Sequence, residues 1–402
     1  MATLIPSNQS HVIVAVSGPD RPGITARLTG ILAQMGANLL DIEQVVVQKQ
    51  LSLGMLIGIQ EDRGVLKELL FAAKELGVSL DFMPVENVQL SANRPERYVV
   101  TAIGKSLGAA EMHALSTTLA DYRANIAKIS RLSHGDLRSV EVIVDMAKGD
   151  GGAAPLKEAL LRLAMRSSFD IALQREGVFR RSKRMVVMDM DSTLIQIEII
   201  DELARAHGVR DQVAAVTEQA MAGEMDYDES LRRRLALLQG LEVSVLKRLS
   251  AELPLTEGAE NLMRALKRLG YRTAVISGGF SVAAESLKAQ LGIDYAYSNT
   301  LEVRDGRLTG RVVGAIVNAK RKAELLDTIA QSEGILLDQV IAVGDGANDL
   351  LMLEKAGLGI AFRAKPKLRA AADTSISAGG LDSILYLLGF NAQEVEEVLA
   401  LP

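Results

Sequence analysis

Hydrophobic and polar residues follow the same order twice in the first 175 positions. In the first block, four apolar runs that predict strands are interrupted by two helically spaced segments, in the order 11–17, 24–35 (helix), 38–49, 51–60, 64–76 (helix) and 79–88. The second block repeats this order over 98–174, after a polar linker at 91–97. Each block therefore predicts a ferredoxin-like βαββαβ unit, the first over 10–90 and the second over 97–175.

From Met185 onward the apolar runs are separated by longer helical segments. Five runs predict strands, at 185–188, 272–277, 295–298, 339–345 and 358–362. Strands that alternate with helices predict a parallel sheet covered on both faces, so the predicted fold over 185–402 is α/β and Rossmann-like. The helix-like residues 198–255 are too many for an ordinary loop and predict a cap over the sheet's carboxyl edge. Asp305-Gly306, between two apolar runs in 299–313, predicts a hairpin.

A basic segment separates the second block from this sheet. Residues 175–184 include four arginines and one lysine and show no apolar periodicity. We interpret the segment as a solvated linker in preference to a functional patch.

The composition excludes several classes of protein. The 402 residues include no cysteine, so disulfides and thiolate metal sites are excluded. A net charge of −5 argues against a nucleic-acid binder. No apolar stretch reaches the roughly 18–20 residues that a membrane span needs, and no signal peptide is visible at the N-terminus. These features predict a cytoplasmic enzyme of two to four domains, with no membrane partner.

Two aspartates follow the strand predicted at 185–188. Asp189-Met190-Asp191-Ser192-Thr193 places two carboxylates one residue apart, followed by two hydroxyls. Open α/β sheets hold their active sites at the carboxyl ends of their strands. Asp189 could attack phosphorus as a nucleophile, while Asp191 could protonate the leaving oxygen and then activate water. The alternative is a strand end followed by a helix that Ser192 or Thr193 caps.

Polar groups also follow two later strands. Ser277-Gly278-Gly279 offers a hydroxyl and open backbone N–H groups to a phosphate. Gly344-Asp345-Gly346-Ala347-Asn348-Asp349 carries two carboxylates four residues apart, which could share one face. Each segment alone fits a plain turn, but three in this order favour a catalytic site.

The available ligands point to a hard metal ion. Without cysteine, and with four histidines that lack ligand spacing, carboxylates remain, and oxygen ligands favour Mg²⁺. The predicted metal site comprises Asp189, Asp191 and Asp345, with Asp349 behind them. Lys320 and Lys322 both precede the Asp345 strand, and either could offset charge on a transferring group.

On these motifs, residues 185–402 resemble the haloacid dehalogenase-type phosphohydrolase superfamily and, within it, the phosphoserine phosphatases. The resemblance implies Mg²⁺-dependent hydrolysis of O-phospho-L-serine through an aspartyl-phosphate, as the last step of serine synthesis. It assigns catalysis to Asp189, Asp191, Ser277 and Lys322, and phosphate contacts to Ser277, Gly278 and Lys322. Lys322 is preferred to Lys320 because it lies 23 residues before Asp345, which resembles the separation in this family.

The same resemblance assigns the substrate contacts. It places Glu198 on the ammonium group and Arg234 on the carboxylate, for which a bidentate guanidinium is well suited. Met221 and Tyr227 would line the pocket, and Asn348 would contact the substrate or its phosphate. The Tyr227 position is more often Phe in this family. A first-turn helix acid is the alternative for Glu198.

Residues 11–90 resemble an ACT domain, an amino-acid-sensing module, on Asp20-Arg21-Pro22-Gly23-Ile24 and Gly36-Ala37-Asn38. The resemblance implies an amino-acid effector, with serine preferred, at Asp20, Gly23 and Asn38, and a homodimer. Residues 97–175 resemble a degenerate second copy, which has Gly104-Lys105-Ser106-Leu107-Gly108 in the matching loop. The alternative for both copies is oligomerisation alone.

Two rival functions are weighed against this hypothesis. The first is a phosphatase or phosphotransferase for another small phosphomonoester, which would leave the pair Glu198 and Arg234 unexplained. The second is an amino-acid-sensing binding protein with a decayed phosphatase domain, which would leave the complete set of motifs unexplained.

Overall fold

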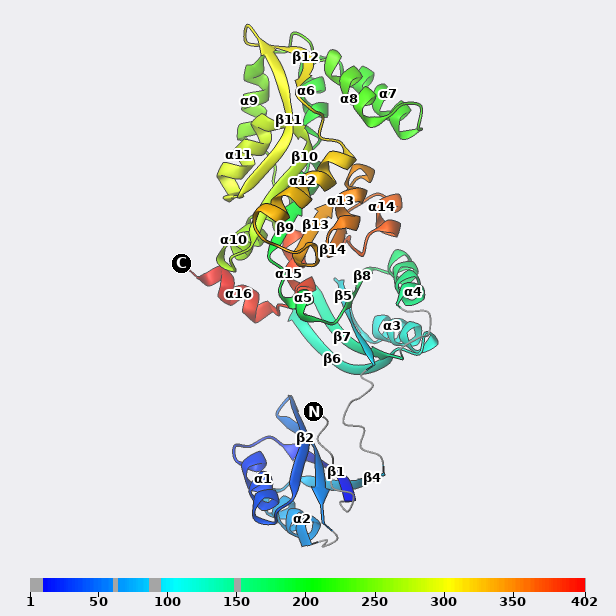
Figure 1. The fold of residues 1–402 in the computed structure, drawn as a ribbon, viewed down its shortest axis with the longest axis vertical. Helices are drawn as coiled ribbons and strands as arrows, with labels where there is room; N and C mark the ends of the chain where they lie inside the picture. Colours follow the sequence, from blue (N-terminus) through cyan, green and yellow to red (C-terminus); the bar gives the residue numbers. More distant parts are fainter. Residues whose placement is uncertain (1–9, 61–63, 87–94, 148–152, 402) are drawn as a thin grey trace. The chain divides into compact units, whose positions relative to one another are not determined.

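The computed structural model describes residues 10–60, 64–86, 95–147 and 153–401 (Figure 1). The chain divides into two compact units, residues 1–94 and 95–402, and each is considered by itself. The linker expected at 91–97 lies mostly outside the described residues. Within the described ranges, no helix is both long and apolar enough to cross a membrane.

The first unit has the predicted βαββαβ order. Its elements are β1 (Ser10–Pro19), α1 (Ile24–Gln34), β2 (Asn38–Val47), β3 (Gln50–Ile59), α2 (Gly64–Leu76) and β4 (Ser79–Val85). The antiparallel sheet has the order β2-β3-β1-β4. Val12, Val14 and Val16 alternate along β1 and are buried with Leu28 of α1 and Leu69 of α2, so both helices cover one face of the sheet.

The second unit begins with another βαββαβ fold. Its elements are β5 (Glu96–Gly104), α3 (Ala109–Asp121), β6 (Asn125–His134), β7 (Arg138–Met146), α4 (Ala154–Arg166) and β8 (Phe169–Arg175), and its sheet has the order β6-β7-β5-β8. Both ferredoxin-like predictions are therefore confirmed.

A seven-stranded sheet follows, in the order β12-β11-β10-β9-β13-β14-β15. Its strands are β9 (Met185–Met188), β10 (Arg272–Phe280), β11 (Tyr295–Arg304), β12 (Arg307–Val313), β13 (Val340–Gly344), β14 (Leu358–Phe362) and β15 (Thr374–Ile376). All neighbours are parallel except β11 and β12, which form the predicted hairpin around Asp305 and Gly306. β15 was not predicted, because three residues are too few to show a pattern.

Helices cover both faces of this sheet (Figure 1). They are α10 (Ala259–Arg268), α11 (Ser281–Leu291), α12 (Ala319–Ser332), α13 (Leu350–Lys355), α14 (Pro366–Ala371), α15 (Ile384–Leu387) and α16 (Ala392–Ala400). Successive residues of β9 belong to different cores: Val186 and Met188 pack with α10 and α11, and Met185 and Val187 with α12. Strands buried on both faces explain the uninterrupted apolar runs of the sequence.

Four helices fill the long insertion after β9, as predicted for a cap. They are α6 (Ile199–His207), α7 (Arg210–Met221), α8 (Tyr227–Ala236) and α9 (Val243–Ala251). An isolated bridge between Ile195 and Leu255 joins the two ends of the insertion. The cap also bonds to the hairpin, where the Gly240 N–H donates to the Leu308 carbonyl at 2.8 Å.

The interpretation of residues 175–184 as a solvated linker is wrong. α5 (Val178–Arg181) lies here, and Arg180 is only 3% exposed and pairs with Glu141 of β7. Lys183 is also buried and donates to the Asp338 carbonyl at 2.6 Å. A run of basic residues resembles a linker in the sequence, since the carboxylate and the carbonyl that receive these side chains lie far away along the chain.

The second ferredoxin-like fold is bonded to the edge of the large sheet. The carboxylate of Asp170, on β8, accepts the backbone N–H groups of Ser377 and Ala378 at 2.6 and 2.9 Å, just beyond β15. The Gln174 side chain donates to the Leu387 carbonyl at 3.0 Å. These contacts explain why residues 95–402 form one compact unit.

Candidate active site

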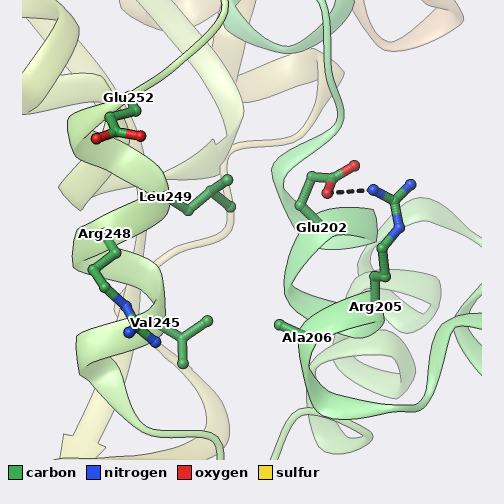
Figure 2. Close-up of a pocket in the computed structure, with 7 residues that line it drawn as sticks. All are labelled: Glu202, Arg205, Ala206, Val245, Arg248, Leu249 and Glu252. Carbon is green, nitrogen blue, oxygen red and sulfur yellow. Dashed lines mark hydrogen bonds and ion pairs between the residues drawn. The ribbon is translucent and has the colours of Figure 1, made fainter.

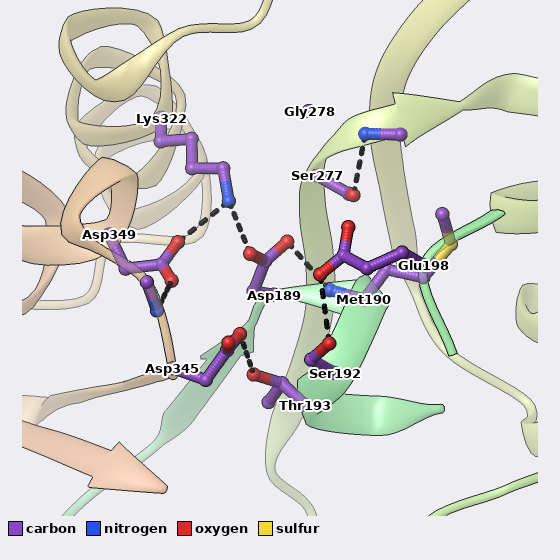
Figure 3. Close-up of polar contacts among 12 residues, drawn as sticks. Asp189, Met190, Ser192, Thr193, Glu198, Ser277, Gly278, Lys322, Asp345 and Asp349 are labelled. Atoms are coloured by element: carbon purple, nitrogen blue, oxygen red, sulfur yellow. Dashed lines mark hydrogen bonds and ion pairs between the residues drawn. The ribbon is translucent and has the colours of Figure 1, made fainter. Parts of the chain in front are cut away.

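The turn after β9 arranges the first motif. The Asp189 carboxylate accepts the Met190 N–H at 2.7 Å, and Ser192 adopts a left-handed conformation, with φ of 56°. The two hydroxyls do not cap a helix: the Thr193 hydroxyl donates to Asp345 at 3.1 Å, and that of Ser192 donates to Glu198 at 2.8 Å (Figure 3). The motif thus connects the loop after β9 to both the Gly344–Asp349 segment and the cap.

Three carboxylates converge at the carboxyl edge of the sheet. Asp189, Asp345 and Asp349 each place an oxygen so that all three lie within 4.8 Å of one another. Burial, together with the charge of Asp189, raises the pKa of Asp345 to about 7. Such crowding of like charges favours a bound cation, and a set made only of oxygens fits Mg²⁺.

Lys322 lies between two of these carboxylates. Its ammonium group is 2.8 Å from Asp189 and 2.7 Å from Asp349, and its side chain is fully buried (Figure 3). Burial alone would lower the pKa of Lys322, but the charges of Asp189 and Asp349 outweigh it and raise that pKa above its ordinary value. Lys320, the other candidate, is 82% exposed on the same helix. The structure therefore brings Lys322, and not Lys320, to the site.

The Asp191 carboxylate lies apart from the three-carboxylate cluster, beside Gly279. A Cβ atom added at Gly279 would lie 2.7 Å from Asp191 Oδ2 and 3.1 Å from Ser277 Oγ, so this close approach requires glycine. Burial raises the pKa of Asp191 well above its ordinary value, and the charges of Glu198 and Asp189 raise it further. Within the described part of the chain, its buried Oδ1 atom has no hydrogen-bond partner.

The second motif forms a tight loop at the end of β10. The buried Ser277 hydroxyl oxygen accepts the Gly279 N–H at 2.8 Å. The Gly278 carbonyl accepts from the Asn299 amide at 2.7 Å and lies 3.5 Å from the Tyr227 hydroxyl of the cap. Sequence reasoning missed Asn299, since nothing in its local pattern distinguishes it from other residues of β11.

The expected substrate clamp is partly assembled. Glu198 lies at the start of α6. Burial raises the pKa of the Glu198 carboxyl, and the nearby charge of half-buried Arg234, on α8, acts against this rise. The ring of Tyr227 packs against the apolar core. Met221 does not act as a buried pocket wall here, because it ends α7 with 66% of its surface exposed. Asn348 is half-buried on the turn after Asp345.

Comparisons with known proteins identify the family. The haloacid dehalogenase-like hydrolase family matches residues 183–357, and ACT domain families match residues 10–83 and 97–174. A phosphoserine phosphatase of Streptomyces coelicolor is 44% identical, over 97% of this chain and 95% of its own length. One from Mycobacterium tuberculosis is 42% identical, over 96% and 94%. The chain belongs to the phosphoserine phosphatase family.

Solved structures agree with this assignment. A haloacid dehalogenase-family hydrolase of Salmonella enterica serovar Typhi is 30% identical, with a TM-score of 0.63 over 73% of this chain and 98% of its own. A probable phosphoserine phosphatase of Vibrio cholerae is 34% identical, with a TM-score of 0.56 over 77% and 91%. The protein is accordingly an enzyme, a phosphoric monoester hydrolase.

The three candidate effector residues of the first ACT domain do not meet within one chain. Asp20 and Gly23 follow the end of β1, whereas Asn38 begins β2. Asn38 and His11 both pair with Gly58, so Asn38 lies level with the start of β1. Eight residues of extended strand separate His11 from Pro19, or about 27 Å. A single pocket that uses all three positions would need a second copy of the domain.

A surface groove of about 410 Å³ lies elsewhere on the cap, between α6 and α9 (Figure 2). Val245, Leu249 and Ala206 line it, and the Glu202 carboxylate turns away to pair with Arg205. It contains none of the motif residues, so it is distinct from the candidate active site.

Proposed function

We propose that the protein hydrolyses O-phospho-L-serine to L-serine and phosphate through a phosphoenzyme at Asp189. The observation that carries this proposal is the position of Asp189, which lies between Lys322 on one side and the loop Ser277–Gly279 on the other. A phosphate held by that loop would present phosphorus to the Asp189 carboxylate. We also propose that the chain has three domains, 10–90, 97–175 and 185–402, and that residues 198–255 of the third domain form its cap.

Two steps account for the reaction. In the first, an Asp189 oxygen bonds to phosphorus while the bond from phosphorus to the serine oxygen breaks, and Asp191 gives its proton to that oxygen. In the second, Asp191 takes a proton from water, which attacks phosphorus and releases Asp189. The raised pKa of Asp191 supports the first step, because it favours the protonated form that can act as the acid.

Lys322 would stabilise the charge that builds on the transferring group. Its ammonium already contacts Asp189, and it is held by Asp349 from behind. The Ser277 hydroxyl and the Gly278 N–H would bind the other phosphate oxygens. Asp189 and Asp345 would hold Mg²⁺ with support from Asp349, whereas the Asp191 carboxylate, also expected at the metal from the sequence, is not part of this cluster. Bound there, Mg²⁺ would neutralise phosphate charge.

The substrate class follows from the clamp. Glu198 would bind the ammonium and Arg234 the carboxylate of phosphoserine, with Tyr227 against its carbon chain and Asn348 near its phosphate. Formation of free serine would complete serine synthesis. A phosphatase for another phosphomonoester remains the second candidate, favoured by the exposure of Met221.

Phosphate release from a panel of phosphomonoesters, with Mg²⁺ or with EDTA, tests the reaction. We expect phosphoserine to be preferred and EDTA to abolish turnover. Acid quenching with ³²P-labelled phosphoserine should label the wild-type protein but not Asp189→Asn, which keeps the side-chain shape without an anionic nucleophile. Labelling of Asp189→Asn would refute the phosphoenzyme at this residue.

We also propose that the first ACT domain binds an amino acid, serine by preference, between two copies of the chain. The separation of Asp20 and Gly23 from Asn38 supports a shared site. β2 also lies at a sheet edge and exposes several apolar side chains, namely Leu39, Ile42, Val45, Val46 and Val47. Such an edge is a ready surface for pairing with another chain.

Variants of the full chain test the dimer and the effector separately. Val45→Lys should lower the sedimentation coefficient, whereas Val178→Lys, which changes an exposed valine elsewhere, should not. Asp20→Ala and Asn38→Ala should weaken inhibition by serine without affecting its action as a product at Glu198 and Arg234. If serine inhibition is unchanged in both variants, the domain is an oligomerisation module.

A further inference from the structure

Asn299 connects two parts of the active site that are distant in sequence. It is 1% exposed, and its amide group makes two hydrogen bonds. Its Nδ2 atom donates to the Gly278 carbonyl at 2.7 Å, and its Oδ1 atom accepts the Val317 N–H at 2.9 Å. A backbone N–H and a carbonyl oxygen can only be satisfied in this orientation, so the network fixes which way the amide points.

The bond to the Gly278 carbonyl also orients the N–H group on the other side of the same peptide. In a trans peptide, the carbonyl of Gly278 and the N–H of Gly279 point in opposite directions. Holding the carbonyl toward Asn299 therefore directs the Gly279 N–H to the other side, where it donates to Ser277 Oγ at 2.8 Å. Because Ser277 Oγ accepts this bond, its own O–H is left to donate elsewhere.

We propose that Asn299 is a positioning residue that orients the Ser277 hydroxyl, through the Gly278–Gly279 peptide, to donate to the phosphate. The inference rests on the proposed phosphatase reaction. Without the Asn299 donor, the peptide could rotate, the Gly279 N–H could itself turn toward the substrate, and the Ser277 proton would lose its fixed direction. Asn299 touches no substrate atom in this account, so its effect depends entirely on Ser277.

Asn299→Asp isolates the relevant bond. The carboxylate keeps the shape of the side chain and an acceptor for Val317, but it cannot donate to Gly278. We expect kcat for phosphoserine to fall about 10- to 100-fold, a fall no larger than that caused by removing one hydrogen-bond donor from an oxyanion hole. We expect KM to change by less than about threefold, because the substrate clamp on the cap is untouched.

A double-mutant cycle with Ser277→Ala separates positioning from a structural role. If Asn299 acts through Ser277, Asn299→Asp should lower the kcat of Ser277→Ala by less than about twofold. An equal fractional loss in both backgrounds would overturn the inference. Asn299→Leu, which introduces no buried charge, repeats the cycle if the aspartate variant does not fold.

A matched control is available at the C-terminus. Asn391 also accepts a backbone N–H, that of Glu394 at 3.0 Å, at the start of α16. Asn391→Asp keeps this acceptor, so its kcat should equal that of the wild type. A wild-type protein that does not hydrolyse phosphoserine would overturn the proposed function, whereas an active wild type with an additive cycle would overturn only the role of Asn299.

Discussion

Replacing Lys322 by methionine should damage both catalysis and stability. Its ammonium lies 2.8 Å from Asp189 and 2.7 Å from Asp349. At an effective dielectric constant near 20, each contact corresponds to a gross attraction of about 6 kcal/mol, and the desolvation of three buried charges offsets much of it. Removing one member of a buried ion pair typically costs about 3–5 kcal/mol, because its partners remain buried and unpaired. We expect a loss of unfolding free energy of that size at pH 8.

The loss should depend on pH and on metal. Without the lysine, the pKa of Asp349, which burial already raises to about 8, should rise further, and protonation at pH 6 should relieve part of the repulsion between the carboxylates. Mg²⁺ should restore part of the stability because it supplies another cation. Phosphate release should fall about 10³-fold in kcat, the lower end of what a cation on a transferring phosphoryl group contributes.

Lys320 provides the matched control, since it lies on the same helix with its side chain in solvent. Lys320→Met removes the same charge and should leave both the urea-unfolding free energy and kcat near wild type. Urea unfolding at pH 6 and pH 8, with EDTA or Mg²⁺, measures the stability, and phosphate release measures kcat. If Lys322→Met and Lys320→Met lose equal stability, the buried ion pairs do not have the importance assigned to them.

Three other predictions can be checked in similar assays. Asp191→Asn should lower kcat for phosphoserine about 10²- to 10⁴-fold, and an unchanged rate would remove Asp191 as the general acid. Arg234→Ala should raise KM about 10- to 100-fold for phosphoserine but little for phosphoethanolamine, which lacks the carboxylate, while exposed Arg233→Ala should affect neither. The pKa of Asp345 is raised to about 7, so between about pH 4 and pH 7 the metal-free folded protein keeps a proton on this carboxyl that the unfolded chain has lost. The contribution of Asp345 to stability therefore falls as the pH rises through this range. Mg²⁺ requires the carboxylate form and should raise the thermal unfolding midpoint more at pH 8 than at pH 6, and equal rises would contradict this reasoning.

The sequence alone was sufficient to predict the architecture of each part. Uninterrupted apolar runs such as 185–188 mark strands buried on both faces, and the alternating βαββαβ order marks the two smaller folds. It also located the carboxylates, because parallel strands end at the same edge of a sheet and Asp189 and Asp345 directly follow two such strands. These are local patterns, readable without knowledge of any contact.

Only the tertiary structure decided which side chains meet. The residues around Lys320 and Lys322 do not distinguish them, and Lys322 is preferred only by its family-like distance from Asp345. The structure shows that Lys322 alone of the two contacts Asp189, from the helix that packs against β9 and β13. In the sequence Arg180 resembles a residue of a solvated linker, and only the folded structure brings Glu141 of β7 into contact with its side chain. Asn299 acquires its two partners only when β11 pairs with β10 and residue 317 returns beside them. Each outcome depends on pairings between distant residues, and these are set by register and packing, which no local pattern encodes.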